Sequence, residues 1–90
     1  MLPLAWRAEA RADLVEIITY IAERNLSAAE RLQGAIVHTA ELLPEHPYIH
    51  RPGRVAGTRE AVIHPNYILI YRVADVIEVL AVLHARQQYP

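Results

Sequence analysis

The sequence predicts an α+β fold, in the order β-α-α-β-β-β, with a helical hairpin packed on one face of an antiparallel sheet. Three observations support this prediction. The first half of the chain has apolar residues at helical spacing, the second half has them at strand spacing, and a segment rich in proline and glycine separates the halves. A chain of 90 residues has room for one domain, so residues 1–90 are expected to fold as a single unit.

The chain opens on a short apolar run and continues as an amphipathic helix. Residues 2–6, LPLAW, are expected to form the first strand. Apolar side chains then follow the i, i+3, i+4 and i+7 spacing of one helix face, which predicts a helix over residues 8–25. These side chains are Leu14, Ile17, Ile18 and Ile21.

A second helix follows after a very short connection. The tetrapeptide SAAE at residues 27–30 has the form of a capping box, in which the Ser27 hydroxyl accepts a backbone N–H and the Glu30 side chain reaches back. The helix is expected to run to about Leu43, because Pro44 cannot continue it. Two helices joined by so short a link form an antiparallel hairpin.

The second half is expected to contain one loop and three strands. Residues 44–57, PEHPYIHRPGRVAG, form the only long segment without either periodicity, and loops of this length in small domains are more often functional than idle. The apolar period then becomes two, so residues 58–64 and 67–73, which flank a Pro-Asn turn, are expected to form a hairpin. Residues 77–83, IEVLAVL, are apolar at nearly every position, which indicates a strand that is central or covered by a partner.

Composition excludes several classes of site. Residues 1–45 carry four arginines and seven acids, a net charge of −3, whereas residues 46–90 carry five arginines and three acids, a net charge of +2. There is no cysteine, so neither a disulfide nor a thiolate metal site is expected. His46, His50 and His64 lack the spacing of metal ligands, so no metal and no cofactor are expected.

No signal peptide opens the chain and no apolar run approaches the ~18 residues of a membrane span, so we expect a cytoplasmic protein without a membrane partner.

Three segments of the second half carry a resemblance to a known family. They are GTRE before the first strand of the hairpin, HPNYILIYRV through the hairpin, and the strand ending LHAR. In this order and at this chain length they resemble the RelE/ParE superfamily of toxins from bacterial type II toxin-antitoxin systems. The resemblance spans nearly the whole chain. It implies a growth-inhibiting toxin with a role in plasmid stabilisation, held in a hetero-oligomer by a cognate antitoxin that folds as it binds.

The composition fits such a partner. Hydrophobic residues make up 53% of the chain, more than a domain of this size can bury, so an exposed apolar strip is expected. An antitoxin segment would cover that strip as a helix in a groove or as an added strand.

The resemblance leaves two targets open, because the superfamily contains two functional classes on one fold. RelE-like members cut mRNA in the ribosomal A site, whereas ParE-like members act on DNA gyrase and are not known as nucleases. For RNA cleavage the chain offers Arg59 and Arg72, expected to bind phosphate from one sheet face, and His84 as a general acid or base. The absence of lysine, the small positive charge of the second half and the LH-x-R form of LHAR favour a ParE-like gyrase inhibitor. A ribosome-dependent mRNA endoribonuclease is the alternative.

The end of the chain, VLHARQQYP, places polar groups directly after the most apolar segment. In either class the resemblance makes this region important for toxicity, so Arg86 and Tyr89 are predicted to bind the target. Arg51 and Arg54 in the loop are predicted to contact it as well.

Purely structural interpretations of the strand residues remain open. His84 can be an edge histidine bonded to a backbone carbonyl, and Arg72 a solvated residue. Arg59 can form a local ion pair with Glu60. A third functional class is a chain that no longer poisons the cell and serves only as an antitoxin-binding module.

Overall fold

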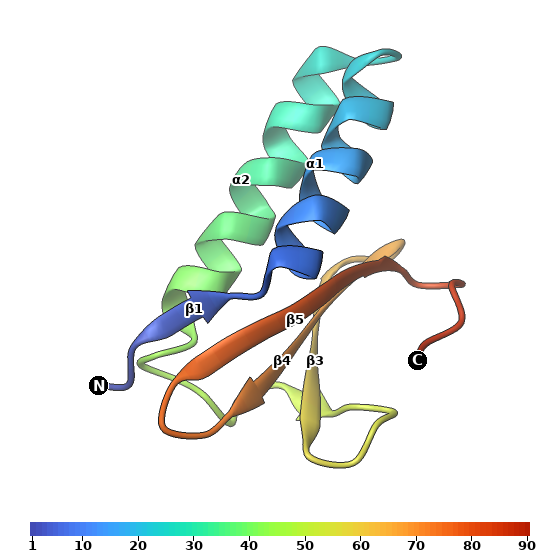
Figure 1. Cartoon of the computed structure of the whole chain (residues 1–90). Helices are drawn as coiled ribbons and strands as arrows, with labels where there is room; N and C mark the ends of the chain where they lie inside the picture. Colours follow the sequence, from blue (N-terminus) through green and yellow to red (C-terminus); the bar gives the residue numbers. More distant parts are fainter.

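The computed structural model describes residues 1–90 and has the predicted order of elements with one short strand added. The first half comprises strand β1 (Leu4–Trp6), helix α1 (Ala8–Ala22) and helix α2 (Leu26–Leu42). Four strands follow: β2 (Arg51–Pro52), β3 (Thr58–His64), β4 (Tyr67–Val73) and β5 (Ile77–His84). The helices run side by side as a hairpin on one face of the sheet, so the predicted α+β fold is confirmed (Figure 1). Neither helix is long and apolar enough to span a bilayer.

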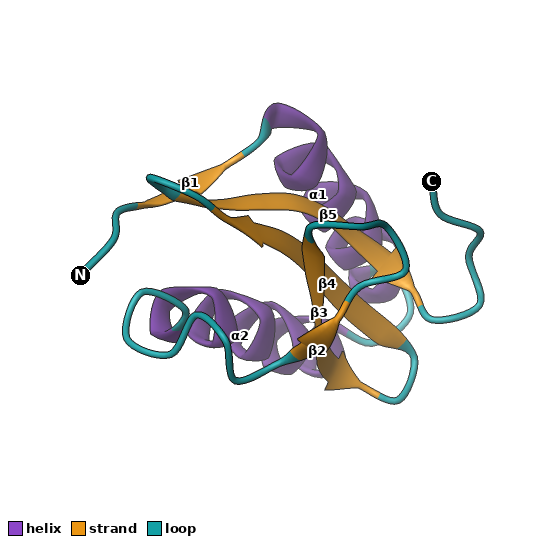
Figure 2. Cartoon of the chain, turned by 90° about the horizontal axis from the view of Figure 1, so that it is seen from below, coloured by secondary structure: helices purple, strands orange, loops and turns teal.

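The sheet is mixed rather than wholly antiparallel. Its strand order is β1-β5-β4-β3-β2, with β1 parallel to β5 and every other pair antiparallel. No turn joins the first strand to the last, so no hairpin forces these two strands to run in opposite directions. The added strand β2 lies inside the segment predicted to be a loop and forms the edge of the sheet beside β3 (Figure 2). The prediction that residues 77–83 form a central strand is confirmed, because β5 lies between β1 and β4.

The connection between the helices differs from the prediction. Helix α1 ends at Ala22, before the expected residue 25. Asn25 caps α2, and its side chain accepts the backbone N–H of Ala28 at 3.0 Å. The predicted capping box at Ser27 is therefore wrong, and the Ser27 hydroxyl instead accepts a hydrogen bond from Arg31. Asparagine and serine cap helices about equally well, so local sequence does not choose between them.

Apolar side chains are buried on both faces of the sheet. The larger cluster lies between sheet and helices and includes the fully buried Ile36, Leu69 and Tyr71. Since side chains alternate along a strand, the neighbours of Leu69 point to the other face. There they form a second cluster, which we call the outer cluster, made of Ile68, Ile70, Leu80, Ala81 and Leu83. The covering of both faces of β5 explains why its sequence is apolar almost throughout.

One glycine offers a test of helix stability. Gly34 lies in the interior of α2, and nothing lies within 4 Å of the position that a Cβ would take. Glycine in a helix interior is less favourable than alanine by about 0.5–1 kcal/mol, so Gly34→Ala is expected to raise the free energy of unfolding by that amount. Chemical denaturation measures the change. Gly57→Ala is the control: space is equally free there, but the φ of +83° disfavours alanine, so this variant should be less stable than the parent. Equal effects at the two positions would contradict the argument.

Candidate functional site at the end of the last strand

Residues 85–90, which we call the tail, turn from the end of β5 toward the sheet face opposite the helices. Strand β5 ends at His84, whose carbonyl accepts the Gln87 backbone N–H at 2.9 Å and whose Nδ1 accepts the Arg86 backbone N–H at 3.2 Å. These bonds turn the chain, and Ala85 and Tyr89 then pack against the outer cluster. Tyr89, predicted to bind the target, therefore also covers apolar surface of the sheet. The guanidinium of Arg86 is exposed and forms no ion pair or hydrogen bond within the chain.

A buried carboxylate connects the loop after β2 to the tail. Glu60 in β3 is 4% exposed and lies opposite Ile70, on the face of the outer cluster. One carboxylate oxygen accepts from Arg51 Nη2 at 3.0 Å, and the other accepts from Nε and the backbone N of Arg54, at 2.9 and 3.0 Å. Arg54 also donates through Nη1 to the carbonyl oxygen of Gln87 at 3.2 Å. One carboxylate thus holds both loop arginines, and one of them reaches the tail.

These contacts set the charge state of Glu60. Burial raises its pKa, but the hydrogen bonds from Arg54 and Arg51 outweigh burial, and the pKa lies below its ordinary value of 4.5. A carboxyl whose pKa is lowered by folding stabilises the fold above its unfolded pKa, and this stabilisation is lost as the pH falls through the folded pKa. At neutral pH the carboxylate is charged and offsets one of the two positive charges of Arg51 and Arg54. Among the arginines predicted to bind the target, Arg86 is the one whose guanidinium makes no bond within the chain.

The two strand arginines predicted to bind one phosphate lie on opposite faces of the sheet. Residues that pair directly across two strands share a face, and here Arg59 pairs with Tyr71 whereas Arg72 pairs with Thr58. Arg72 forms an ion pair with Glu78 on the outer face. Arg59 donates to two backbone carbonyls of the segment before β2 and makes no ion pair with its neighbour in sequence. The expectation of a shared phosphate site, and that of a local ion pair in GTRE, are wrong.

A β-bulge is the physical reason for this arrangement. Next to the turn, His64 pairs with Tyr67, and continuous pairing from there would place Arg59 opposite Arg72 on one face. The register instead shifts by one residue between Val62 and His64. After a shift of one residue, each later side chain lies opposite a different residue of the neighbouring strand. Two side chains that continuous pairing would place on one face then lie on opposite faces of the sheet.

His84, the predicted general acid or base for RNA cleavage, lies at the far end of the sheet from Arg72. His84 pairs with Tyr67 at the start of β4, and their rings are 5.4 Å apart in an edge-on arrangement. Arg72 lies five residues further along β4, which is about 17 Å at ~3.4 Å per residue. A general acid must lie within about 3 Å of the atom to which it gives a proton. Tyr67 packs toward the helices, so its pair His84 lies on that face too, whereas Arg72 lies on the outer face, and the two side chains therefore do not contact the same phosphate.

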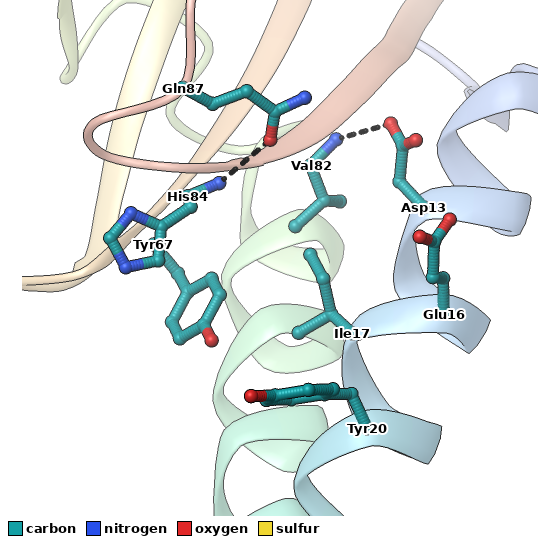
Figure 3. Close-up of a pocket in the computed structure, with 8 residues that line it drawn as sticks. All are labelled: Asp13, Glu16, Ile17, Tyr20, Tyr67, Val82, His84 and Gln87. Carbon is teal, nitrogen blue, oxygen red and sulfur yellow. Dashed lines mark hydrogen bonds between the residues drawn. The ribbon is translucent and has the colours of Figure 1, made fainter.

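A pocket of about 230 Å³ opens between α1 and the end of β5 (Figure 3). Asp13 on α1 accepts the backbone N–H of Val82 at 3.0 Å, a donor on the edge of β5 beyond the end of β1. Burial raises the pKa of Asp13, the bond from Val82 opposes this, and Glu16 adds to the rise. The other residues that line the pocket are Ile17, Tyr20, Tyr67, His84 and Gln87.

A second pocket of about 370 Å³ lies on the other side of Tyr67, between the two helices and the end of the β3–β4 hairpin. Its lining is mostly apolar and comprises Ile21, Ala28, Arg31, Leu32, Ala35, Ile63, His64 and Tyr67. The two pockets share Tyr67, and we call them together the wedge groove. Figure 1 shows why it is open: the helical hairpin extends past the sheet, and its outer half has no strand beneath it. No group of three or more His, Asp or Glu side chains is arranged to hold a metal ion.

The sequence alone did not reveal the contacts that Asp13 and Glu60 make. Both are single carboxylates, one on an amphipathic helix and one in an alternating strand. From the sequence, Glu60 is predicted only as a partner of Arg59. The signal that was available is its alternation with Arg59, which places the two side chains on opposite faces and excludes the local pair.

Solved structures of bacterial toxins share this fold. A chromosomal ParDE toxin-antitoxin system from P. aeruginosa matches with a TM-score of 0.83 and 24% identity, over 93% of this chain and 96% of that chain. The toxin-antitoxin complex RelBE2 from Mycobacterium tuberculosis matches with a TM-score of 0.65 and 25% identity, over 97% of each chain. The helical hairpin on a five-stranded sheet, closed by a charged tail, defines the class: a toxin of the RelE/ParE superfamily.

Sequence comparison narrows the class to one family. The family described as the ParE toxin of type II toxin-antitoxin system, parDE, matches residues 4–89, and the chain belongs to it. Y4kP of Sinorhizobium fredii is 39% identical over 88 residues, which cover 97% of this chain and 92% of that protein. Toxin RelE2 of Caulobacter vibrioides is 34% identical over 88 residues, which cover 94% of this chain and 97% of that protein.

Proposed function

We propose that this type II toxin stops growth by binding DNA gyrase and that a cognate antitoxin neutralises it. The observation that carries the choice of gyrase is the separation of the cleavage candidates. Arg59 and Arg72 lie on opposite faces, and His84 lies about 17 Å along the sheet from Arg72. This separation supports a gyrase target over RNA cleavage. The match to the ParE family supports the same target.

The surface proposed to contact gyrase is the tail with the adjoining end of β5. Arg86 presents an unpaired guanidinium there, and arginine is one of the residue types that contribute most to protein–protein contacts. The Arg54 guanidinium is bonded to the carbonyl of Gln87, the residue that follows Arg86 in the chain. A protein surface with matching acidic groups is the partner that this charge favours.

A side-by-side assay tests the target. Purified chain, freed of antitoxin, is added to a gyrase supercoiling reaction and, separately, to a translation extract in which transcript integrity is followed. We expect loss of supercoiling and intact transcripts. Cleaved transcripts with normal supercoiling would establish the ribosome-dependent endoribonuclease instead. The similarity to Toxin RelE2 is the reason to test for this activity. Neither effect, with antitoxin binding retained, would indicate the antitoxin-binding module.

The wedge groove is the surface that we assign to the antitoxin. Two of the structural relatives are a ParDE toxin-antitoxin system and the RelBE2 toxin-antitoxin complex, so those toxins assemble with antitoxins. The groove has an apolar half for aliphatic side chains and an acidic half, with Asp13 and Glu16, for a cationic side chain. An amphipathic segment with apolar anchors and one arginine or lysine has the complementary chemistry. Because His84 and Gln87 line the acidic half, a segment bound there also contacts the base of the tail.

A charge placed in the apolar half should weaken antitoxin binding. Ala35 is exposed and lines that pocket. Ala35→Glu would place a carboxylate against apolar side chains of a bound segment, so the dissociation constant is expected to rise by about tenfold or more. Titration calorimetry with the antitoxin peptide measures it. Gln33→Glu, on the same helix but outside the groove, is the matched control and should change the affinity little. Equal affinities for both variants would show that the antitoxin binds elsewhere.

A further inference from the structure

The tail has few polar connections to the rest of the protein. Its first residue, Ala85, donates its backbone N–H to the carbonyl of Asn66 at 2.7 Å. Beyond that residue, the one hydrogen bond from the tail to a residue distant in sequence is the bond from Arg54 Nη1 to Gln87. Beyond the turn at His84, the tail's course over the outer cluster is therefore set by apolar contact and by this single guanidinium.

The position of Arg54 is itself set by one side chain. The same oxygen of Glu60, Oε2, accepts both the backbone N–H and the Nε–H of Arg54. Backbone and side chain of Arg54 are therefore fixed together, and the planar guanidinium directs its other nitrogen toward the tail. Glu60 is 4% exposed, and hydrogen bonds between charged groups shielded from water are among the strongest in proteins.

We propose that Glu60 is a positioning residue of the toxin: through Arg54 it holds the tail in one arrangement and so presents Arg86 to the target. The inference rests on the proposed function, because it takes the tail as the target-binding end. Its chemistry does not depend on a particular target, since the contacts from Glu60 to Gln87 lie within the chain. Preorganising a binding segment in this way lowers the entropy that is lost when the target binds.

Two substitutions test the contacts that connect Glu60 through Arg54 to Gln87, each at a different residue. Glu60→Gln keeps the shape of the side chain but removes its charge and presents an amide donor to two guanidinium groups. Arg54→Lys keeps the charge and the attraction to Glu60, but a single ammonium does not reproduce the two-sided bonding of the planar group. Glu78→Gln is the matched control, because Glu78 pairs with Arg72 and Arg7 on the same sheet but does not contact the tail.

The first measurement is amide hydrogen exchange at Arg86 and Gln87, whose backbone N–H groups are bonded at the base of the tail. Exchange at both amides is expected to accelerate about tenfold in Glu60→Gln and in Arg54→Lys, and to stay at the parent rate in Glu78→Gln. The second measurement is the concentration that half-inhibits gyrase, expected to rise about tenfold in the same two variants. The affinity for a peptide that occupies only the apolar half of the wedge groove should change by less than about threefold, since that half does not contact the tail.

Each result decides the inference. Unchanged exchange at the tail amides in Glu60→Gln overturns it, whether or not the chain acts on gyrase. Faster exchange with unchanged inhibition by a variant of an active parent also overturns it, as does an equal loss in Glu78→Gln. If the parent itself does not inhibit gyrase, the proposed function fails, and the exchange rates alone then decide whether Glu60 positions the tail.

Discussion

Tyr71→Ala is expected to lower the free energy of unfolding by about 3–5 kcal/mol. Tyr71 is fully buried in the larger cluster between sheet and helices. Its hydroxyl donates to the carbonyl of Pro47 at 2.7 Å, and its ring meets His50 edge-on at 6.0 Å between centroids. The side chain thus fills the core and also holds the segment after α2 against the sheet. A loss of this size is a large share of the roughly 5–15 kcal/mol that stabilises a typical domain.

A conservative variant separates the two contributions of Tyr71. Tyr71→Phe keeps the ring and removes the hydroxyl, which leaves the Pro47 carbonyl without this donor, at an expected cost of about 1–2 kcal/mol. Burial raises the pKa of the Tyr71 phenol, so the group keeps its proton and remains a donor at neutral pH. Chemical denaturation of the parent and both variants provides the comparison. If the Phe variant is as unstable as the Ala variant, ring packing contributes little and the interpretation is wrong.

Arg86→Glu is expected to weaken inhibition of gyrase by roughly thirtyfold or more, the factor that corresponds to loss of an interface hot spot. Arg86 is exposed and its guanidinium is unpaired within the chain, so reversing its charge removes attraction to the target without breaking an internal contact. The free energy of unfolding should change by no more than about 0.5 kcal/mol. Titration of purified variants in a supercoiling reaction measures the loss.

The control for Arg86 is another exposed arginine that forms no ion pair. Arg11 on α1 meets this description and lies far from the tail in sequence, so Arg11→Glu makes the same change in net charge. Its inhibition should stay close to that of the parent. Equal losses in both variants would indicate a general effect of net charge rather than a contact by the tail. Deletion of residues 84–90 is a less specific test, because it would uncover the outer cluster.

Periodicity alone predicted most of the elements. Helical spacing in the first half and strand spacing in the second located both helices and the three long strands to within a few residues. These predictions succeeded because each element buries one face or both, and burial imposes its own period on the sequence. The quoted motifs also led to the correct superfamily.

Relations between elements were decided only by the tertiary structure. An apolar period of two predicts which residues of one strand share a face of the sheet. It does not predict which residues of two neighbouring strands lie on the same face. That depends on register, and a single bulge between Val62 and His64 separates Arg59 from Arg72. The parallel direction of β1 and the contacts from Glu60 to the tail likewise join residues far apart in the chain. Local patterns carry no information on such pairings, because packing and hydrogen bonding across the assembled sheet select them.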